Sequence, residues 1–222
     1  MKKANYCLMP KIEPFDEYSS EYDDWYDKYV HAYQSELEAI RSILPPFDKG
    51  IEIGVGSGRF AAPLRIRQGL EPSRKMASLA AKRGIKVTVG VAEKLPFESD
   101  NFDLVLMVTV ICFLDDVAQA FREAHRILKW GGHIVVGFID RDSPLGQIYH
   151  KSKSESPFFR FANFYSANEV SNFLKAAGFI NQEFCQTIFK GPEEIDQTEN
   201  VEDGHGQGLF AVVKAKKKST NL

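Results

Sequence analysis

Cysteine is scarce in this sequence. Cys7, Cys112 and Cys185 are the only three in 222 residues, and no two of them form a C-x-x-C pair. Such spacing indicates neither a disulfide framework nor a cysteine-based zinc site, and it fits a reducing cytoplasm.

No run of about 18 apolar residues occurs, so no transmembrane helix is expected. The start, Met1-Lys2-Lys3, leads into mixed polar residues rather than an apolar signal core, which predicts a cytoplasmic, unexported protein.

An excess of charge of one sign is also lacking. The chain has 28 lysines and arginines against 30 aspartates and glutamates, which gives a formal net charge of -2. No basic footprint for DNA or RNA follows from this balance, so we expect no nucleic-acid partner. The basic run at residues 214–218 is typical of a solvated tail and is assigned no role.

The most informative pattern is an acidic residue followed by a glycine turn, in the segment Ile51-Glu52-Ile53-Gly54-Val55-Gly56-Ser57-Gly58. Glycine adopts the unusual backbone angles that such a turn needs, and it lets a ligand approach where a Cβ would collide. A helix expected at residues 59–65 would direct free N–H groups and its positive dipole end at the turn, which favours an anion there. A tight turn without a ligand is the alternative interpretation.

Two other nucleotide-binding turns do not fit this segment. A dinucleotide fingerprint needs its third glycine at position 59, where this chain has Arg59. A phosphate-binding P-loop ends in G-K-[ST], whereas this turn ends in Gly58-Arg59-Phe60. Neither a nicotinamide or flavin cofactor nor ATP is therefore expected.

Apolar runs and helical segments alternate along the chain after Pro45-Pro46. Strands are expected near 49–53, 66–71, 85–90, 102–108 and 133–139, and helices near 59–65, 73–83 and 115–128. This alternation predicts an α/β fold with a parallel sheet covered by helices on both faces. Ser166 and Glu169 form a capping box that predicts a helix to Ala177, ended by Gly178. Two closing strands are expected at 180–189 and 209–216.

A second carboxylate, Glu71, ends the second apolar run and lies 13 residues beyond Gly58. A carboxylate at this strand end can accept hydrogen bonds from both hydroxyl groups of a ribose. An exposed glutamate that caps a helix is the alternative. The motif Gly90-Val91-Ala92-Glu93-Lys94-Leu95-Pro96-Phe97 and the glycine turn in 128–136 follow in order.

Aromatic residues recur in the N-terminal segment, which is expected to form one helix over residues 16–44. Its tyrosines lie three or four residues apart, which places them on one helical face, with Trp25 close by: Tyr18, Tyr22, Tyr26, Tyr29 and Tyr33. One interpretation is core packing. The other is a roof over a ligand site, with π faces turned toward a cation, and both can hold. If the helix is a lid, removing residues 1–40 should spare the fold.

These segments, in this order, resemble class I S-adenosylmethionine-dependent methyltransferases, in the branch that includes enzymes of ubiquinone and menaquinone biosynthesis. The resemblance covers roughly residues 15 to 180. It implies a Rossmann-like, doubly wound sheet, mostly parallel with an antiparallel last strand, under an N-terminal helical cap. It divides the chain into a cap segment, 1–44, and a cofactor-binding domain, 45–218, within a single domain overall.

The resemblance also implies S-adenosylmethionine as cofactor, with its methionine carboxylate as the anion at the turn. The cofactor-binding residues that it implies are Glu52, Gly54, Gly56, Ser57, Gly58, Glu71, Pro72, Ala92, Glu93, Met107 and Tyr22. The expected substrate residues are Trp25, Tyr26 and Tyr29. One position departs from the family: Val91 stands where many members have an aspartate that accepts from the adenine amino group. Glu93 or a backbone carbonyl is the expected substitute.

The expected chemistry is direct, in-line transfer of a methyl group to a small-molecule acceptor, because a sulfonium methyl is already activated and needs mainly proximity and orientation. No catalytic residue and no metal ligand set can be assigned. Candidates for a base are His31, Asp115, His125 and His150, and none has motif support. Aromatic residues at 158–165 are expected either to wall a ring-containing acceptor or to pack under the next helix.

Three further interpretations of the sequence stay open. The segment 191–208 is expected to be a mobile loop or a lid. The chain could be a different nucleotide-dependent enzyme on a Rossmann-like fold. It could also bind S-adenosylmethionine or its demethylated product without catalysis, as a sensor or a partner subunit, because the sequence requires no catalytic base.

Overall fold

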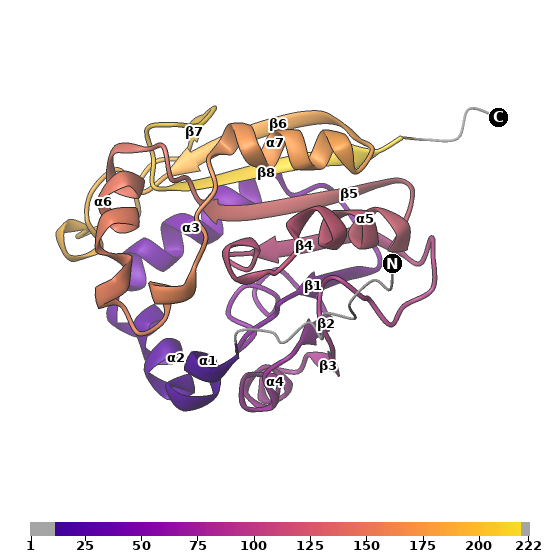
Figure 1. Ribbon diagram of the computed structural model, residues 1–222, viewed down its shortest axis with the longest axis horizontal. Coiled ribbons are helices and arrows are strands. Elements are labelled where there is room, and N and C mark those ends of the chain that lie inside the picture. Colours follow the sequence, from indigo (N-terminus) through magenta and orange to yellow (C-terminus); the bar gives the residue numbers. More distant parts are fainter. Residues whose placement is uncertain (1–11, 219–222) are drawn as a thin grey trace, which may run out of the picture.

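The computed structural model describes residues 12–218, so Cys7 and residues 1–11 of the expected cap segment lie outside the described part. Its centre is an eight-stranded sheet with the strand order β3-β2-β1-β4-β5-β8-β6-β7 (Figure 1). The strands are β1 Gly50–Ile53, β2 Gln68–Glu71, β3 Lys86–Val89, β4 Phe102–Val108, β5 Leu128–Ile139, β6 Phe179–Thr187, β7 Glu202–Asp203 and β8 Phe210–Lys217. Strands β1 to β5 pair in parallel, whereas β8 runs antiparallel to β5 and β6. The predicted Rossmann-like α/β sheet with an antiparallel last strand is confirmed.

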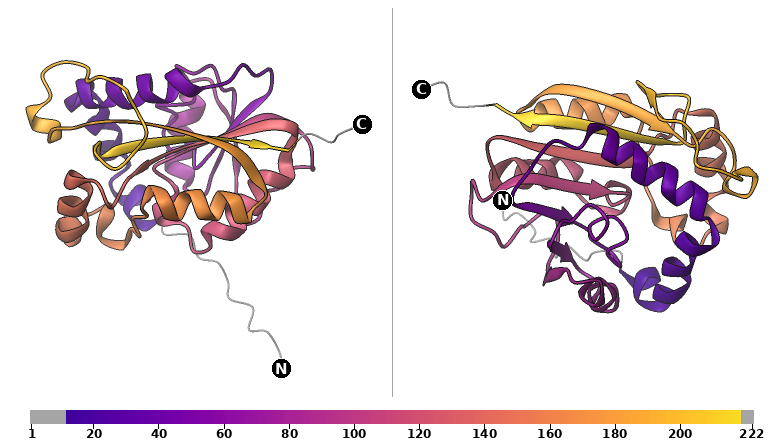
Figure 2. Two further views of the ribbon diagram at one scale, coloured as in Figure 1. Left: turned by 90° about the horizontal axis from the view of Figure 1, so that it is seen from above. Right: turned by 180° about the vertical axis from the view of Figure 1, so that it is seen from behind.

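Helices cover both faces of this sheet. Seen from above, α3 lies on one side of the sheet and α7 on the other (Figure 2). On the α7 side, α5 packs against α7 and β5. Helix α4 packs against β2 and β3, and its Ala80 joins the same core cluster as Ala39 and Ile40 of α3. The helices are α1 Glu13–Glu17, α2 Ser19–Lys28, α3 Val30–Ile43, α4 Arg74–Lys82, α5 Val117–Ile127, α6 Pro144–Ser152 and α7 Ala167–Ala176. Single 3₁₀ turns are η1 Ile111–Phe113, η2 Lys153–Glu155, η3 Phe159–Phe161 and η4 Pro192–Glu194.

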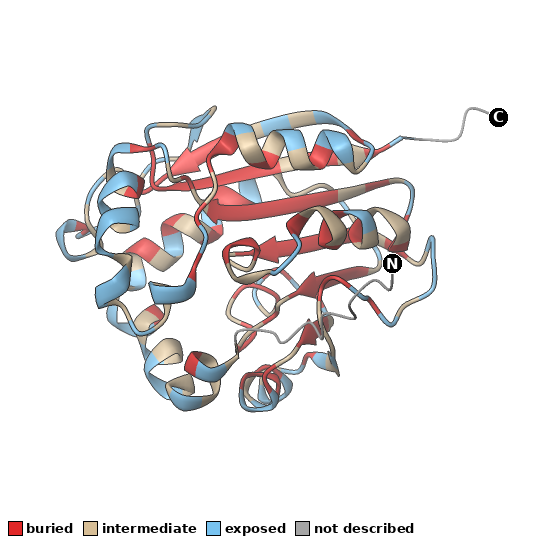
Figure 3. Cartoon of the chain, in the orientation of Figure 1, coloured by how far each residue is buried: buried red, intermediate tan, exposed pale blue. Residues whose placement is uncertain are grey.

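Strand β4 shows how the sequence builds two apolar layers. Successive side chains of a strand point to opposite faces of a sheet. Val105 and Met107 therefore join the core beneath α5 and α7, while Leu104, Leu106 and Val108 join the core beneath α3. Strand β1 is buried along its whole length, and β4 is buried except at Asp103 (Figure 3). A nearly continuous apolar run is what a parallel strand covered on both faces requires.

Helix α7 begins and ends where the sequence predicts. The Ser166 hydroxyl accepts from the Glu169 N–H at 3.2 Å, and the Glu169 carboxylate accepts from the Ser166 N–H at 2.8 Å. Gly178 follows the helix with a φ of +95°, a conformation that favours glycine. Both ends are set by local hydrogen bonding, which explains why the sequence alone predicts them.

The expected helix at 59–65 is wrong. The Ala62 N–H reaches the Gly58 carbonyl, but the Ile66 N–H bonds the Ala61 carbonyl, five residues back. Arg65 has a φ of +60°, so the chain leaves the turn and enters β2 directly. The segment is a series of turns, and no helix dipole points at the glycines.

The single N-terminal helix is also wrong, because the chain breaks at Tyr18 and Tyr29 into three helices. Tyr18 and Tyr29 have φ near -110° and positive ψ, outside the helical region. Ala39 and Ile40 of α3 are fully buried against the sheet. Removing residues 1–40 would expose this layer, so the structure argues against the expectation that the fold survives that deletion.

The segment 191–208 contains local structure and contacts α3. Strand β7 pairs antiparallel with β6, and the Glu199 N–H donates to the Ser35 hydroxyl of α3 at 2.8 Å.

Over residues 12–218, no helix has the length and apolar character needed to cross a membrane. The same residues contain no group of three or more potential metal ligands.

Candidate functional site

The candidate site lies where β1, β2 and β4 end. All three run in parallel, so their carboxyl ends meet at one edge of the sheet. The order β3-β2-β1-β4-β5 reverses its direction of growth between β1 and β4. Open α/β sheets bind ligands in the crevice at such a reversal.

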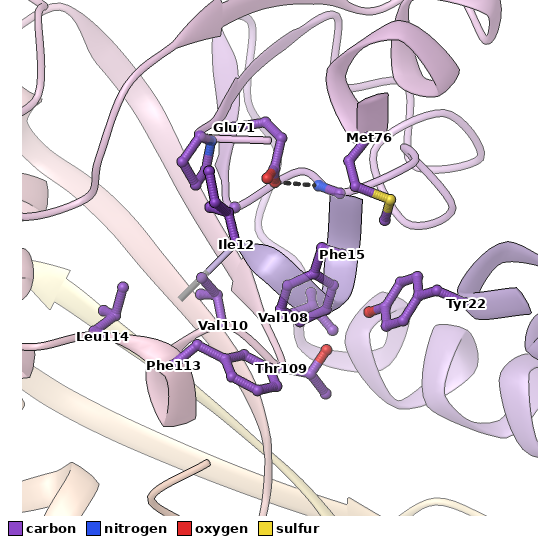
Figure 4. A pocket seen from close by; sticks show the side chains of 13 residues that line it. Ile12, Phe15, Tyr22, Glu71, Met76, Val108, Thr109, Val110, Phe113 and Leu114 are labelled. Carbon is purple, nitrogen blue, oxygen red and sulfur yellow. Dashed lines mark hydrogen bonds between the residues drawn. The ribbon is translucent and has the colours of Figure 1, made fainter. Parts of the chain in front are cut away.

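A cleft of about 570 Å³ opens at this edge. Figure 4 shows Glu71 on one wall, Tyr22 projecting from α2 on another, and Thr109 and Phe113 from the segment after β4. Two smaller hollows share Gly54 with it. One reaches Ala92, Glu93 and Asp115, and the other reaches Glu52, Ser57 and Arg59.

Glu71 is held rigidly at the cleft. One carboxylate oxygen accepts the N–H of Gly56 at 2.9 Å (Figure 4), and the other accepts the N–H of Ser73 at 2.9 Å. Burial raises the pKa of Glu71 to about 7, against the opposing effect of these two hydrogen bonds. Ser73 in turn caps α4 by accepting from the Met76 N–H. The carboxylate is therefore fixed in place before any ligand arrives.

Glu52 and Ser57 bring unsatisfied polar atoms to the second hollow. Glu52 is 1% exposed, and burial raises its pKa well above the usual value. Among the described residues, Oε2 of Glu52 and Oγ of Ser57 have no hydrogen-bond partner. Buried polar atoms are almost always satisfied in proteins, so these two point to a ligand with polar groups of its own.

The three glycines of the turn have different roles. A Cβ at Gly54 would collide with Val110, and one at Gly58 would lie 2.5 Å from Cδ1 of Ile85. A Cβ at Gly56 would meet only the Met76 methyl, at 3.6 Å. All three have positive φ. Gly54 and Gly58 therefore serve packing, whereas Gly56 leaves its backbone open to the cleft.

An ion-pair network holds α2 over the turn. The Arg59 guanidinium bonds both carboxylate oxygens of Asp23, at 2.8 and 3.0 Å, and also contacts Asp27. Arg83 donates to Asp23 at 2.7 Å and to the Ser57 carbonyl at 2.9 Å. Burial acts to raise the pKa of Asp23, but the hydrogen bonds from Arg59 and Arg83 and the positive charge of Arg83 outweigh it and lower the pKa to about 2. One wall of the cleft is thus tied to the glycine turn.

A second cavity, of about 750 Å³, adjoins the cleft. Tyr22 and Thr109 line both spaces. Half of the residues that line the cavity are aromatic, and they come from α2, α6, η3 and β8 and from Phe158 next to η3. Glu36 of α3 is the only charged residue among the described residues of this lining, and burial raises its pKa to about 8.

Comparisons with known proteins agree with this geometry. A family model described as a methyltransferase domain matches residues 51–136. A crystal structure from Thermotoga maritima, described as an S-adenosylmethionine-dependent methyltransferase and possible histamine N-methyltransferase, superposes with a TM-score of 0.91 at 46% identity. It covers 93% of this chain and 100% of its own. The chain belongs to the S-adenosylmethionine-dependent methyltransferases.

Two proteins with similar sequences support this assignment. An uncharacterized protein of Methanocaldococcus jannaschii is 46% identical over 203 residues, which are 91% of this chain and 98% of the relative. A demethylmenaquinone methyltransferase of Chlorobaculum parvum is 31% identical over 168 residues, or 64% of this chain and 70% of the relative. The methyltransferase is thus a class I enzyme of the menaquinone-type branch, and its cofactor is S-adenosylmethionine.

The structure brings together most of the residues that the sequence assigns to the cofactor. Nine of them line the cleft and its hollows: Glu52, Gly54, Gly56, Ser57, Glu71, Pro72, Ala92, Glu93 and Tyr22. Gly58 and Met107 do not line these spaces. Gly58 packs against Ile85, and Met107 is 1% exposed in the core.

The substrate residues divide in the same way. Trp25 and Tyr26 line the aromatic cavity, whereas Tyr29 does not and instead donates to Glu193 at 3.4 Å. Phe158 and Phe159 also line the cavity, while Phe164 is buried in a separate apolar cluster. Of the aromatic residues at 158–165, Phe158 and Phe159 thus line the cavity, and their role as a wall for the acceptor stays a prediction.

The candidate bases lie mostly elsewhere. Asp115 lines the hollow near Ala92, but no histidine of the described residues lines the cleft, its two hollows or the aromatic cavity. His125 packs edge-on against Phe179, and His150 against Phe164. Sequence reasoning missed Thr109, Met76 and Glu36, because each is a common residue inside an otherwise ordinary strand end or helix.

Proposed function

We propose that this methyltransferase transfers a methyl group to a small organic acceptor that binds in the aromatic cavity. The observation that carries the proposal is the shared wall: Tyr22 and Thr109 line both the glycine-lined cleft and the aromatic cavity. Two adjoining spaces of contrasting chemistry suit two ligands that must meet. A buried, largely apolar cavity with few polar groups is typical of a small-molecule site.

The cleft residues fit S-adenosylmethionine. The unsatisfied Oε2 of Glu52 can accept from the ammonium of the methionine part, and the unsatisfied hydroxyl of Ser57 can donate to its carboxylate. The Glu71 oxygens can accept from the ribose hydroxyls, since each retains a free lone pair beside its backbone N–H. The open backbone at Gly56 permits the close approach that this arrangement needs.

The adenine end has Val91 where the family resemblance leads one to expect an aspartate. Val91 offers no side-chain acceptor for an amino group. Glu93 is 8% exposed, and its Oε1 accepts the N–H groups of Asp115 and Asp116 at 3.0 and 3.4 Å. We assign the adenine amino group to Asp115, whose exposed side chain lines the same hollow. Glu93 then positions the segment that carries Asp115.

The chain itself contributes orientation and exclusion of water. S-adenosylmethionine supplies an activated methyl group on a sulfonium. Tyr22 stands between the two spaces, and its hydroxyl accepts from Tyr26 at 3.0 Å. Burial raises the pKa of Tyr22 to about 12, so the hydroxyl stays neutral at pH 7. Placing two reactants in line is worth a large part of such a barrier, and no base is required for an acceptor that is already nucleophilic.

The segment that forms α1 and α2 is proposed as the cap of the site. Phe15 and Tyr22 line the cleft, and α2 is bound to the turn through Asp23 and Arg59. Helix α3 lies in the core, so the cap in this proposal is shorter than the 1–44 segment expected from the sequence. A cap that closes over the sulfonium would exclude water.

The test is transfer of label from S-adenosylmethionine carrying a labelled methyl group to a panel of ring-containing small molecules. The panel follows two relatives: one is named a demethylmenaquinone methyltransferase, and the other is described as a possible histamine N-methyltransferase. Label in a small-molecule product supports the proposal. Cofactor binding by calorimetry with no transfer to any panel member would favour the non-catalytic sensor instead.

A further inference from the structure

We propose that the aromatic cavity binds a positively charged amine and that Glu36 is the anion that pairs with it. The inference rests on the proposed function and goes further, because it names the chemical class of the acceptor and the residue that selects it. The ammonium group anchors the acceptor and is not the methylated atom, because a protonated nitrogen has no lone pair; the methyl group goes to another, uncharged nucleophilic atom of the same molecule.

The position of Glu36 is unusual for a glutamate. It lies on α3, on the helix face where Ala32 also lines the cavity. Its neighbours Leu37 and Ile40 are buried in the core. Over residues 12–218, no hydrogen bond or ion pair to the Glu36 carboxylate is formed. A carboxylate in an apolar setting without a partner is rare, because burial of a charge is costly unless it is paired.

The pKa of the carboxylate records this cost. Burial alone raises the pKa of Glu36 to about 8. The negative charge also acts on its surroundings, since it helps to raise the pKa of Tyr22, Tyr26 and Tyr149 after the larger effect of their own burial. A cation placed among these groups would pair with the carboxylate and relieve the cost.

The rest of the lining suits a cation with a ring. Tryptophan and tyrosine faces attract ammonium groups, most strongly where water is excluded. Trp25 and Tyr26 lie on one side of the cavity, and Tyr149 and Phe158 come from other elements. No lysine or arginine is among the described lining residues, so nothing in the lining repels a positive charge. Aromatic rings around one carboxylate form a recognition site for an arylalkylamine.

The experiment compares two probes of nearly equal shape. 2-Phenylethylamine is charged and 2-phenylethanol is its uncharged counterpart at about pH 8, where Glu36 also begins to ionise, so the comparison is made at that pH. Their dissociation constants are measured by calorimetry with saturating S-adenosylhomocysteine, on the full chain and on Glu36→Gln. Glu38→Gln is the matched control, because Glu38 lies on the same helix but is exposed and pairs with Arg41 at the surface.

We expect the wild-type chain and Glu38→Gln to bind the amine at least about tenfold more tightly than the alcohol, as a charge-assisted contact implies. In Glu36→Gln this preference should fall to about threefold or less. The variant should fold, because it removes a buried charge, and a thermal melt checks this. If it does not fold, the preference of the wild-type chain decides the question.

Equal affinity of the wild-type chain for the two probes would overturn the inference, as would binding of neither probe. A preference that persists in Glu36→Gln would overturn the role of Glu36. These failures are separable from failure of the proposed function. If the protein methylates uncharged acceptors and shows no preference for amines, only the inference about Glu36 is refuted. If the amine preference is present and is lost in Glu36→Gln, but no acceptor is methylated, only the proposed methyl-transfer function is refuted.

Discussion

The cofactor cleft and the aromatic cavity adjoin each other but are built in different ways. The cleft is made mainly by short segments that directly follow β1, β2 and β4, and its polar contacts involve backbone N–H groups of the turns. The cavity is made by side chains from residue 22 to residue 210, on helices and strands that meet only in the folded chain. The first region is therefore determined by backbone geometry and the second by packing.

Gly56→Val should have the largest effect, because it blocks the cofactor cleft and leaves the aromatic cavity unchanged. The added side chain would occupy the open face of the turn and oppose a φ of +52°. We expect S-adenosylmethionine affinity to fall by more than about 100-fold, which corresponds to roughly 3 kcal/mol. Calorimetry measures the loss.

Gly84→Val is the matched control for Gly56→Val. Gly84 has a φ of +81°, a Cβ there would meet only Nη1 of Arg67, at 3.8 Å, and Gly84 lines neither the cleft nor its two hollows. Both variants bear a backbone strain of about 1–2 kcal/mol. Normal cofactor binding by Gly56→Val would mean that the turn is purely structural.

The contrast between the regions also explains what the sequence could predict. The glycine turn and the capping box at Ser166 each depend on residues within a few positions of one another, and Glu71 ends the next apolar run, 13 residues beyond Gly58, so their spacing indicates their structure. The helix expected at 59–65 failed because the segment forms a series of turns that ends at Arg65, which has a φ of +60°, and no local signal marks that change. Glu36 could not be recognised, since its setting depends on Tyr149, Phe158 and Phe210, more than a hundred residues away.

Glu71→Gln should have the next largest effect, confined to the cleft. Removing a charged acceptor from two hydroxyl groups is worth roughly 1.5–3 kcal/mol, so the dissociation constant for S-adenosylmethionine should rise about 10- to 100-fold. Asp103→Asn is the control, because Asp103 also accepts a backbone N–H, from Lys49 at 2.8 Å, but lies at the start of β4. An unchanged affinity in folded Glu71→Gln would remove the ribose assignment.

The pH dependence of cofactor binding sharpens this test. The pKa of Glu71 is raised to about 7 by burial, so the carboxylate ionises between about pH 6 and 8. Hydroxyl groups need the ionised acceptor, so cofactor affinity should increase over that range and lose this dependence in Glu71→Gln. Folding stability follows the opposite sign: the raised pKa favours the folded state below the usual pKa of a glutamate, and this contribution is lost as the pH rises through 7.

Asp23→Asn should have a smaller effect, because it loosens the wall that the two regions share. The Asp23 side chain is 16% exposed and bonds both Arg59 and Arg83, whereas the Asp27 side chain is 69% exposed. We expect Asp23→Asn to weaken cofactor binding about 3- to 10-fold, and Asp27→Asn to change it little, as is usual for exposed ion pairs. The pKa of Asp23 is about 2, so its stabilising contribution is present above pH 4 and lost as the pH falls toward 2. Equal effects of the two variants would mean that Asp23 does not couple α2 to the turn.

The smallest expected effect is a change in tryptophan fluorescence, which distinguishes ligand binding in the cavity from ligand binding in the cleft without a substitution in either region. Trp25 lines the aromatic cavity but not the cleft, and the second tryptophan, Trp130, is 52% exposed and can be removed by Trp130→Phe. In that background, 2-phenylethylamine should shift or quench the emission of Trp25, because it enters the space against the indole ring. S-adenosylhomocysteine alone should change the emission less, since it contacts Trp25 only through Tyr22 and Tyr26. A larger response to S-adenosylhomocysteine than to the amine would show that α2 moves when the cleft fills, and the two regions would then form one site that closes as a unit.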